Sequence, residues 1–313
     1  MANTKLRFRF REPTVDTNQP LSDGTVKIEG YDLEVLTDPR ADCDVWDAGF
    51  GELVQAYAKD APYVSIPAFP NRKFRLSYIF INTSAGIKEP KDLEGKRVGI
   101  MGWGNTAGVW ARGALQNYYE VDLHKIRWLT TLPGPSDPAG IHIDDLPKGS
   151  NLDALLVSGE LDAVIQPDVL DSVARRDPRT RRLFTDWKTE EQTYYKQTGV
   201  FPISHSVTFR QEYVAQHPDA PVALLKAYRQ ARDVAFDMVE GGNPHTLVIS
   251  WASAAMAEQR ALMGENYWPY NVADNARVLE ALTQFALQQG LTQGKKLNYE
   301  TFFHPEAAAL PGF

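Results

Sequence analysis

The sequence has a single cysteine, Cys43, so no disulfide can form within the chain, which fits a reducing compartment. It has no run of basic residues: 33 lysines and arginines stand against 40 acidic residues, and the net charge is −7. Nucleic-acid-binding domains carry basic patches, so this balance argues against nucleic acid as a partner. No stretch approaches the roughly 20 apolar residues of a membrane-spanning helix, and we expect no membrane partner.

The N-terminal residues do not show the pattern of a secretory signal. Such a signal needs an apolar core of about 7–15 residues after a basic start. Here Arg7, Arg9 and Arg11 interrupt every apolar run. We therefore expect a cytoplasmic protein, unless a leader has been removed from the sequence. Cys43 precedes a predicted strand, where a small buried residue is favoured over a catalytic thiol.

Alternation of apolar and polar residues predicts strands in the first part of the chain. The segments with this pattern are 6–11, 31–37, 44–50, 63–69 and the run that ends at 82, with a helix at about 51–59. From Ser84 the order is strand (97–101), glycine-rich turn, helix (about 106–119) and strand (126–131), the rhythm of a parallel βαβ unit. Beyond residue 205 the chain is mostly helical, with one helix starting near 220 and another at Asp274.

These elements predict an α/β fold of two lobes. The simplest assembly has residues 83–204 inserted as one lobe, and residues 1–82 plus 205–313 forming the other. Two lobes joined by crossing segments leave a ligand cleft between them.

The segment "AFPNRKFRLSYIFIN" (68–82) is expected to cross between the two lobes. Basic residues stand in its first half, before an apolar run. Arginine suits planar, bidentate recognition of a carboxylate. If the run is one strand, Arg75 and Ser77 share a face, with Arg72 just upstream. We expect these three residues to bind an anion in the cleft; surface ion pairs are the plainer alternative.

A glycine turn follows the strand at 97–101. Gly102, Gly104 and Gly108 invite a dinucleotide-binding interpretation, but the spacing is one residue too long, and the next strand ends without the acidic residue that would bind ribose. The start of a helix still offers unpaired N–H groups to an anion. We expect Asn105 or Thr106 as the N-cap and Ala107 among the binding groups, although a turn that merely connects strand to helix stays an alternative.

Three sequence blocks carry a resemblance to a known family. They are F-P-x-R-x-F-R-x-S (69–77), T-A-x-V-W-A-R-G (106–113) and F-P-I-x-H (201–205). With them the chain resembles 4,5-dihydroxyphthalate decarboxylase and its relatives over nearly its whole length. The resemblance implies a type II periplasmic-binding-protein-like fold and the loss of one carboxylate from a dihydroxylated aromatic diacid.

The resemblance also suggests roles for further residues. Arg112 falls in the second block, and Trp103 in the turn is a candidate to stack on an aromatic ring. His205 closes the third block, and its ordinary titration range suits proton donation. Asp47 stands where the family has an acidic residue in the first lobe, so we expect it to handle a hydroxyl proton.

The expected ligand is a small anionic aromatic molecule, and the scheme requires no organic cofactor. A divalent metal held between catechol oxygens stays open, but His142 with its neighbouring aspartates lacks the spacing of a metal site.

The chain departs from the family pattern at Arg9, Arg11 and Glu12, and again at 49–55, which would line the cleft. The substrate is therefore either 4,5-dihydroxyphthalate or a related diacid. The alternative function is a non-catalytic solute-binding protein for a carboxylate. Oligomeric state stays open, with a homo-oligomer among the options.

Overall fold

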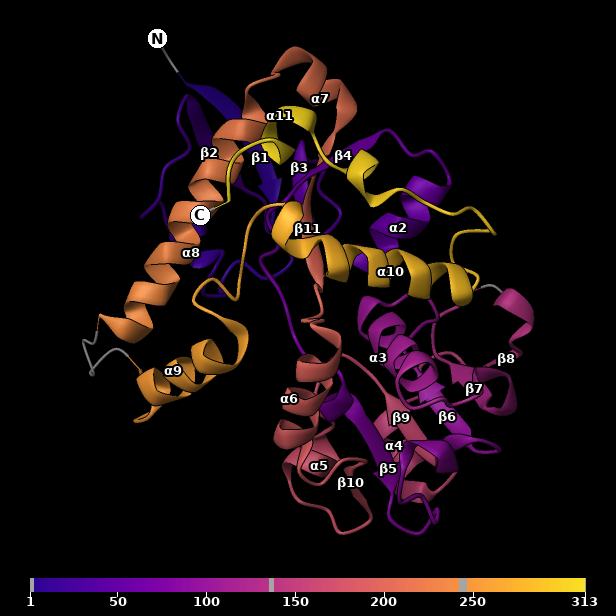
Figure 1. The fold of residues 1–313 in the computed structure, drawn as a ribbon. Coiled ribbons are helices and arrows are strands. Elements are labelled where there is room, and N and C mark those ends of the chain that lie inside the picture. The colour runs from indigo at the N-terminus through magenta and orange to yellow at the C-terminus, as the bar shows by residue number, and fades with distance from the viewer. Residues whose placement is uncertain (1–2, 135–137, 242–246, 313) are drawn as a thin grey trace.

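The computed structural model describes residues 3–134, 138–241 and 247–312. Two sheets of strands form separate lobes, one above the other in Figure 1, with helices around each. None of the helices in these ranges combines the length and apolar character that a membrane crossing requires.

The first sheet has the strand order β2-β1-β3-β11-β4. Its strands are β1 (Thr4–Arg9), β2 (Tyr31–Val35), β3 (Val45–Gly49), β4 (Tyr63–Ile66) and β11 (His205–Arg210). Strand β11 lies antiparallel between β3 and β4, with His205 opposite Gly49. Leu6, Phe8, Val45 and Phe209 are fully buried and share one face of this sheet, because Phe8 and Phe209 both lie opposite Val45.

The second sheet has the order β10-β5-β9-β6-β7-β8. Its strands are β5 (Ile79–Asn82), β6 (Arg97–Ile100), β7 (Arg127–Thr130), β8 (Ile143–Asp145), β9 (Ala163–Ile165) and β10 (Thr180–Arg182). The four strands β9, β6, β7 and β8 are parallel, which confirms the predicted βαβ rhythm. The segments after β6 and β9 therefore leave the sheet at the same edge, a usual place for a ligand.

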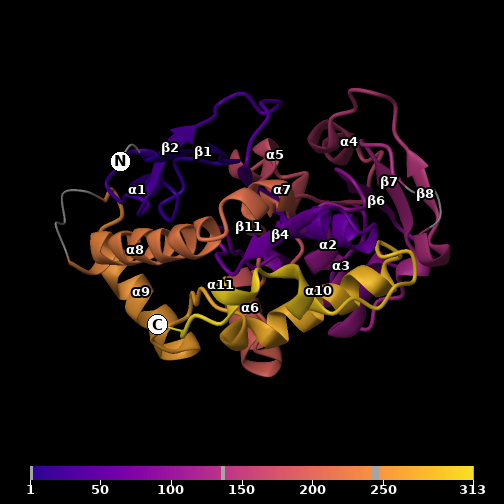
Figure 2. The ribbon, with the colours of Figure 1, turned by 90° about the horizontal axis from the view of Figure 1, so that it is seen from above.

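The helices surround both sheets (Figures 1 and 2). Their bounds are α1 (Gln19–Ser22), α2 (Phe50–Ala58), α3 (Thr106–Asn117), α4 (Leu152–Ser158), α5 (Asp171–Ala174), α6 (Trp187–Thr198), α7 (Gln211–Gln216), α8 (Ala220–Glu240), α9 (Ala252–Met263), α10 (Ala276–Gln288) and α11 (Pro305–Ala308). Helix α10 packs on both α2 and α3, and so ties the two lobes together. The predicted helices at 51–59 and 106–119 match α2 and α3 to within one or two residues.

The first crossing between lobes differs from the prediction in two ways. Strand β5 belongs to the second sheet, so the crossing falls before Leu76 and not after Asn82. Residues Leu76–Tyr78 form a short 3₁₀ helix, which breaks the alternation expected of a continuous strand. The expectation that Arg75 and Ser77 share one strand face is therefore wrong. The outgoing and returning segments touch at an isolated bridge between Arg72 and Ile203.

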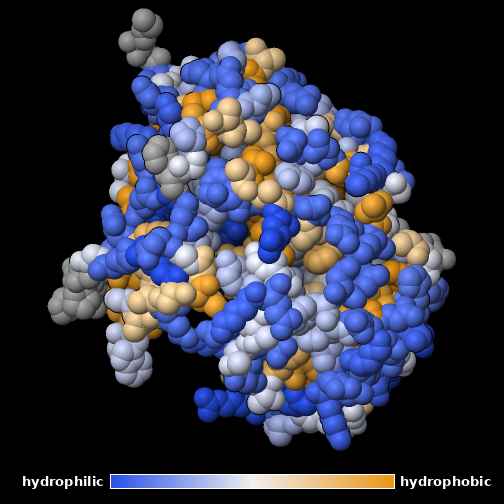
Figure 3. Space-filling model, viewed as in Figure 1, coloured by the Kyte–Doolittle hydropathy of each residue, from blue (hydrophilic) through white to orange (hydrophobic). Residues whose placement is uncertain are grey.

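The surface seen in Figure 3 is mostly hydrophilic, with apolar side chains scattered over it in small groups. Cys43 is buried, as predicted, and burial raises the pKa of its thiol. A raised pKa disfavours the reactive thiolate, so the structure supports packing over nucleophilic chemistry at this residue.

Candidate active site

A cavity of about 280 Å³ lies between the two lobes, close to the lower end of the usual size of small-molecule pockets. Residues from both lobes and from the crossing segments line it. They are Arg11, Glu12, Gly49, Glu52, Asn71, Lys73, Arg75, Met101, Asn105, Thr106, Ala107, Pro167, Asp168, Ser204 and His205. Five of the ten predicted site residues are in this set: Arg75, Asn105, Thr106, Ala107 and His205.

Arg75 is the buried cation of the cavity, with 7% of its surface exposed. Its Nη2 donates to the hydroxyl of Ser204 at 2.7 Å, and its Nη1 donates to the carbonyl of Pro167 at 3.2 Å. Both acceptors are neutral, and Nε has no hydrogen-bond partner among the described residues. Burial lowers the pKa of the guanidinium, since its charge is poorly solvated. An anion entering the cavity would supply the missing counter-charge.

Two helices begin at the cavity wall. Asn105 is the N-cap of α3, and its side chain accepts the N–H groups of Ala107 at 3.1 Å and Gly108 at 3.4 Å. The N–H of Ala107, expected to bind an anion, is therefore already occupied, as is the N–H of Gly108. The hydroxyl of Thr106 accepts the N–H of Gly51 in the first turn of α2 at 3.0 Å. The two helix N-termini thus meet, and both direct the positive ends of their dipoles to this region.

His205 lies at the start of β11, with 9% of its surface exposed, and its ring forms part of the cavity wall. Burial, helped by the positive charges of Arg11 and Arg75, lowers the pKa of His205 from 6.5 to about 3. In the ligand-free protein the imidazole is therefore neutral around pH 7. The proton that we expect it to donate must be acquired when a ligand binds or must come through water.

Asp47 lies behind His205, away from the cavity. Its Oδ2 is 4.0 Å from Nδ1 of His205, beyond hydrogen-bond distance. The carboxylate accepts the backbone N–H of Arg11 and the side-chain amide of Asn18, the latter at 3.2 Å. Burial raises the pKa of Asp47 from 3.8 to about 6, despite these hydrogen bonds. Asp47 does not line the cavity, so the prediction that it handles a ligand hydroxyl is wrong; Glu52, on the next helix, lines the wall instead.

Arg72 and Ser77 lie outside the cavity. The guanidinium of Arg72 donates to the side chain of Asn275 and is flanked by two aromatic rings, those of Phe69 at 5.4 Å and Phe201 at 5.7 Å. The backbone N–H of Ser77 donates to the carboxylate of Glu191 at 2.8 Å. Both residues are buried in packing, so neither contacts a ligand in the cavity, contrary to the prediction.

Trp103 and Arg112 also lie outside the cavity, stacked on each other. The guanidinium carbon of Arg112 is 3.8 Å from the ring centre of Trp103. Both side chains bond to Gln289, through Nε of Arg112 at 2.9 Å and Nε1 of Trp103 at 2.8 Å. Both are almost fully buried. They fasten the first turns of α3 to the end of α10 and do not present a ring or a charge to the cavity.

The sequence analysis missed four polar residues that line the cavity: Asn71, Lys73, Asp168 and Ser204. Asp168 carried a usable signal, because it lies three residues after the end of the buried parallel strand β9, and ligands collect at that end of such strands. Ser204 adjoins His205 and had no separate signal. No group of three or more His, Cys, Asp or Glu side chains suited to hold a metal ion occurs within the described ranges.

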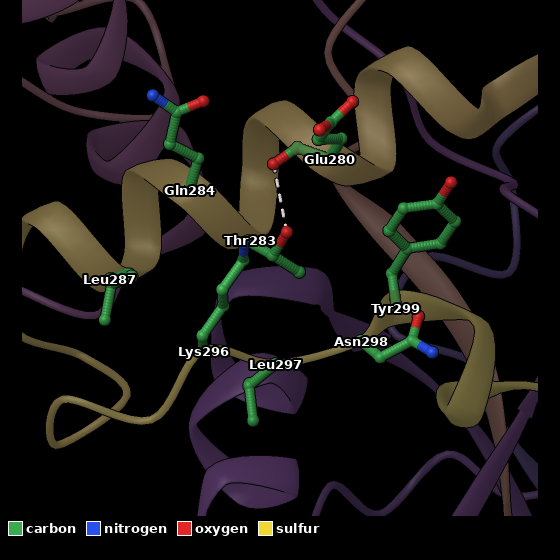
Figure 4. A pocket seen from close by; sticks show the side chains of 8 residues that line it. All are labelled: Glu280, Thr283, Gln284, Leu287, Lys296, Leu297, Asn298 and Tyr299. Carbon is green, nitrogen blue, oxygen red and sulfur yellow. Dashed lines mark hydrogen bonds between the residues drawn. The ribbon is translucent and has the colours of Figure 1, made fainter.

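A second cavity, of about 480 Å³, lies between α10 and the segment from Lys296 to Tyr299 (Figure 4). None of the predicted site residues lines it. The hydroxyl of Thr283 donates to carbonyls of its own helix, as the dashed line in Figure 4 shows for Glu280. This second cavity does not combine a buried cation with helix N-termini, as the cavity between the lobes does.

Comparisons with known proteins agree with this geometry. The family model described as NMT1/THI5 like matches residues 48–127, a segment that contains the N-termini of α2 and α3. The aliphatic sulphonate binding protein SsuA of Escherichia coli has a similar fold, with a TM-score of 0.58, 15% identity, and coverage of 98% of this chain and 99% of that one. The desulfurization enzyme DSZB is also similar, with a TM-score of 0.53, 16% identity and 98% coverage of both chains.

These structural neighbours show a two-lobed, periplasmic-binding-protein-like fold, as expected from the sequence, and the fold occurs in a described enzyme as well as in a binding protein. A closer relationship comes from sequence. A 4,5-dihydroxyphthalate decarboxylase of Comamonas testosteroni is 30% identical over 332 aligned positions, which cover 99% of this chain and 99% of that protein. With similarity along the whole of both sequences, the chain belongs to the 4,5-dihydroxyphthalate decarboxylase family.

Proposed function

We propose that the protein removes carbon dioxide from 4,5-dihydroxyphthalate or a closely related hydroxylated aromatic diacid. The observation that carries this proposal is the full-length similarity to the decarboxylase of Comamonas testosteroni. The cavity between the lobes supports it, because a buried arginine without a carboxylate partner faces a space suited to a small anion. The proposed setting is the cytoplasm, where such a substrate would be degraded.

In the proposed complex, Arg75 binds the carboxylate that the product retains. Its Nε, free among the described residues, can donate to a carboxylate oxygen. The N-terminus of α3 lies on the same wall and adds favourable potential through its dipole, although Asn105 already occupies two of its N–H groups.

The chemical step replaces a carboxylate on the ring with a proton. The hydroxyl para to the departing group pushes electron density toward the carbon that carries it, and that carbon accepts a proton. The bond to the carboxyl carbon then breaks, its electron pair returns to the ring, and carbon dioxide leaves. The enzyme must stabilise this protonated ring more than the bound diacid, since only differential stabilisation speeds the reaction.

His205 is the proposed proton donor, directly or through a water that it positions. It is neutral in the empty cavity, and two substrate carboxylates nearby would raise the pKa of its ring again, because opposite charges favour the charged form. Asp47, 4.0 Å behind the imidazole, favours the same protonated state when it is ionised. We therefore assign Asp47 a positioning role and no contact with substrate.

The test is to incubate the purified protein with 4,5-dihydroxyphthalate and to follow carbon dioxide and 3,4-dihydroxybenzoate, with and without EDTA. Release of both products, abolished in a His205→Ala variant, would support the proposal, and the EDTA arm decides whether a metal participates. Saturable binding of the diacid without turnover would favour the alternative, a binding protein. That alternative draws on the fold of SsuA and on the same cavity cation.

A further inference from the structure

The cavity between the lobes has a buried cation beneath a rim of mixed charge. Its buried lining residues include one cation, Arg75, together with Thr106, Ser204 and His205. Its exposed lining residues carry both signs: the cations Arg11 and Lys73 and the acids Glu12, Glu52 and Asp168. The buried charge is therefore positive, and a carboxylate entering the cavity is attracted toward Arg75.

The buried cation determines how an aromatic diacid would lie, if the proposed function holds. Its two carboxylates occupy neighbouring ring positions and would enter first, toward Arg75 and His205. Positions 4 and 5 are on the opposite edge of the ring, so the two hydroxyl groups would face the rim. Carboxylates accept hydrogen bonds from hydroxyl groups, so the acidic residues of the rim can meet the donors of the ligand.

Of the three rim acids, two already face a partner. Glu12 accepts the side-chain amide of Asn71 at 3.4 Å, and Glu52 lies 3.6 Å from the guanidinium of Arg11. Among the described residues the carboxylate of Asp168 has no hydrogen bond and no close ion pair, although its charge acts on the guanidinium of Arg75 at longer range. It is the rim acceptor that a ligand can engage without breaking a contact.

The backbone on either side of Asp168 is held in place. Nη1 of Arg75 donates to the carbonyl of Pro167 at 3.2 Å, and the side chain of Gln166 donates to the carbonyl of Asp168 itself at 3.2 Å. The same guanidinium has an unpartnered Nε, more than nine-tenths buried with the rest of the side chain. One arginine thus fixes the distance between the deep carboxylate subsite and the rim.

We propose that Asp168 selects substrates by their ring hydroxyl groups. Its carboxylate accepts a hydrogen bond from a hydroxyl at position 4 or 5, and it repels diacids that present no donor there. Selection of this kind combines an attractive contact for the correct ligand with a repulsive one for its analogue. The proposal rests on the proposed function and adds a specificity-determining residue to it.

The test compares binding of 4,5-dihydroxyphthalate and unsubstituted phthalate by titration calorimetry at one pH and salt concentration. The wild type should bind the dihydroxylated diacid at least about tenfold more tightly, the size expected of a hydrogen bond to a charged group. Asp168→Ala should lose most of this preference, with phthalate bound equally or more tightly than before. Asp168→Asn, which keeps an acceptor oxygen, should retain part of it.

The matched control is Asp145→Ala, which removes the same charge from an exposed position in β8, remote from the cavity lining. It should leave both affinities unchanged. Equal weakening of both diacids in Asp168→Ala, an unchanged preference, or a wild type without preference would each overturn the role of Asp168. If the wild type bound neither diacid, the proposed function itself would fail, which is a separate result.

Discussion

Arg75 and Ser204 are joined by a 2.7 Å hydrogen bond from Nη2 to the serine hydroxyl. The bond connects the segment that leaves the first sheet to the residue just before the strand that returns to it. It places the guanidinium beside His205 at the cavity wall, so that one crossing supplies the cation and the other supplies the imidazole.

Replacing Arg75 with alanine should weaken substrate binding strongly. A charge-assisted hydrogen bond contributes about 1.5–3 kcal/mol, so we expect KM for the diacid to rise roughly ten- to a hundredfold. Arg75→Lys should recover only part of the loss, because an ammonium cannot bind a carboxylate in the bidentate geometry of a guanidinium. Steady-state kinetics on the folded variants measures both. An unchanged KM in Arg75→Ala would contradict the assignment.

Arg72→Ala is the matched comparison, because Arg72 is equally buried and only three residues away, yet lies outside the cavity. The change removes the contacts with Phe69 and Phe201 and leaves the side-chain oxygen of Asn275 without this donor. We expect a loss of about 2–4 kcal/mol in the free energy of unfolding with KM nearly unchanged. Denaturant unfolding and kinetics together test this; a large rise in KM without destabilisation would place Arg72 in the site.

His205 should make the protein sensitive to acid. Its pKa is lowered from 6.5 to about 3 in the folded state, so between these values the unfolded chain binds more protons. The contribution of His205 to the free energy of unfolding is therefore fully present above pH 6.5. It is lost as the pH falls toward 3. Asp47, with a pKa raised to about 6, acts in the opposite direction below that pH and offsets part of the effect.

A His205→Asn variant should therefore lose less stability than the wild type between pH 7 and pH 4.5. Thermal unfolding at several pH values measures the difference. His304→Asn should change the acid stability in the same direction, since burial also lowers the pKa of His304, although that residue is not in the cavity lining. Parallel acid-stability curves for wild type and His205→Asn would show that the imidazole is not held neutral by burial.

Gly108 should tolerate alanine poorly, although alanine favours helices by about 1 kcal/mol over glycine. A Cβ at this position would lie 2.7 Å from Nη1 of Arg112, in a part of the core with little room for movement. We expect Gly108→Ala to lower the melting temperature, and Arg112→Met, which shortens the neighbour, to relieve part of that effect in the double variant. A melting temperature equal to or above that of the wild type would show that the space is larger than the structure indicates.

The predictions from sequence succeeded where one local pattern determines one local structure. The periodicity of residues 51–59 and the glycine turn before residue 106 located α2 and α3, whose N-termini form part of the cavity wall. His205 and Arg75 were likewise identified from the blocks that contain them. The predicted lobe boundary lies one strand too late, because residues 68–82 were interpreted as one continuous strand. Alternation of apolar and polar residues does not reveal the 3₁₀ turn at Leu76–Tyr78.

Three of the errors in the site have one physical origin. Arg72, Trp103 and Arg112 have the side chains of ligand-binding residues, but each has a partner at one end of helix α10, at Asn275 just before it or at Gln289 just after it. Those partners are more than 170 positions away in the sequence, so no local pattern signals them.

The position of β11 between β3 and β4 has a consequence for how the chain acquires its structure. Strand β4 pairs only with β11 in its sheet, so it cannot join β3 until the whole second sheet has been synthesised. Pairings so distant in sequence slow folding, whereas β5 to β10 are contiguous and can assemble first. We expect the second lobe to fold early during translation. The first sheet can form fully only after β11 has been synthesised.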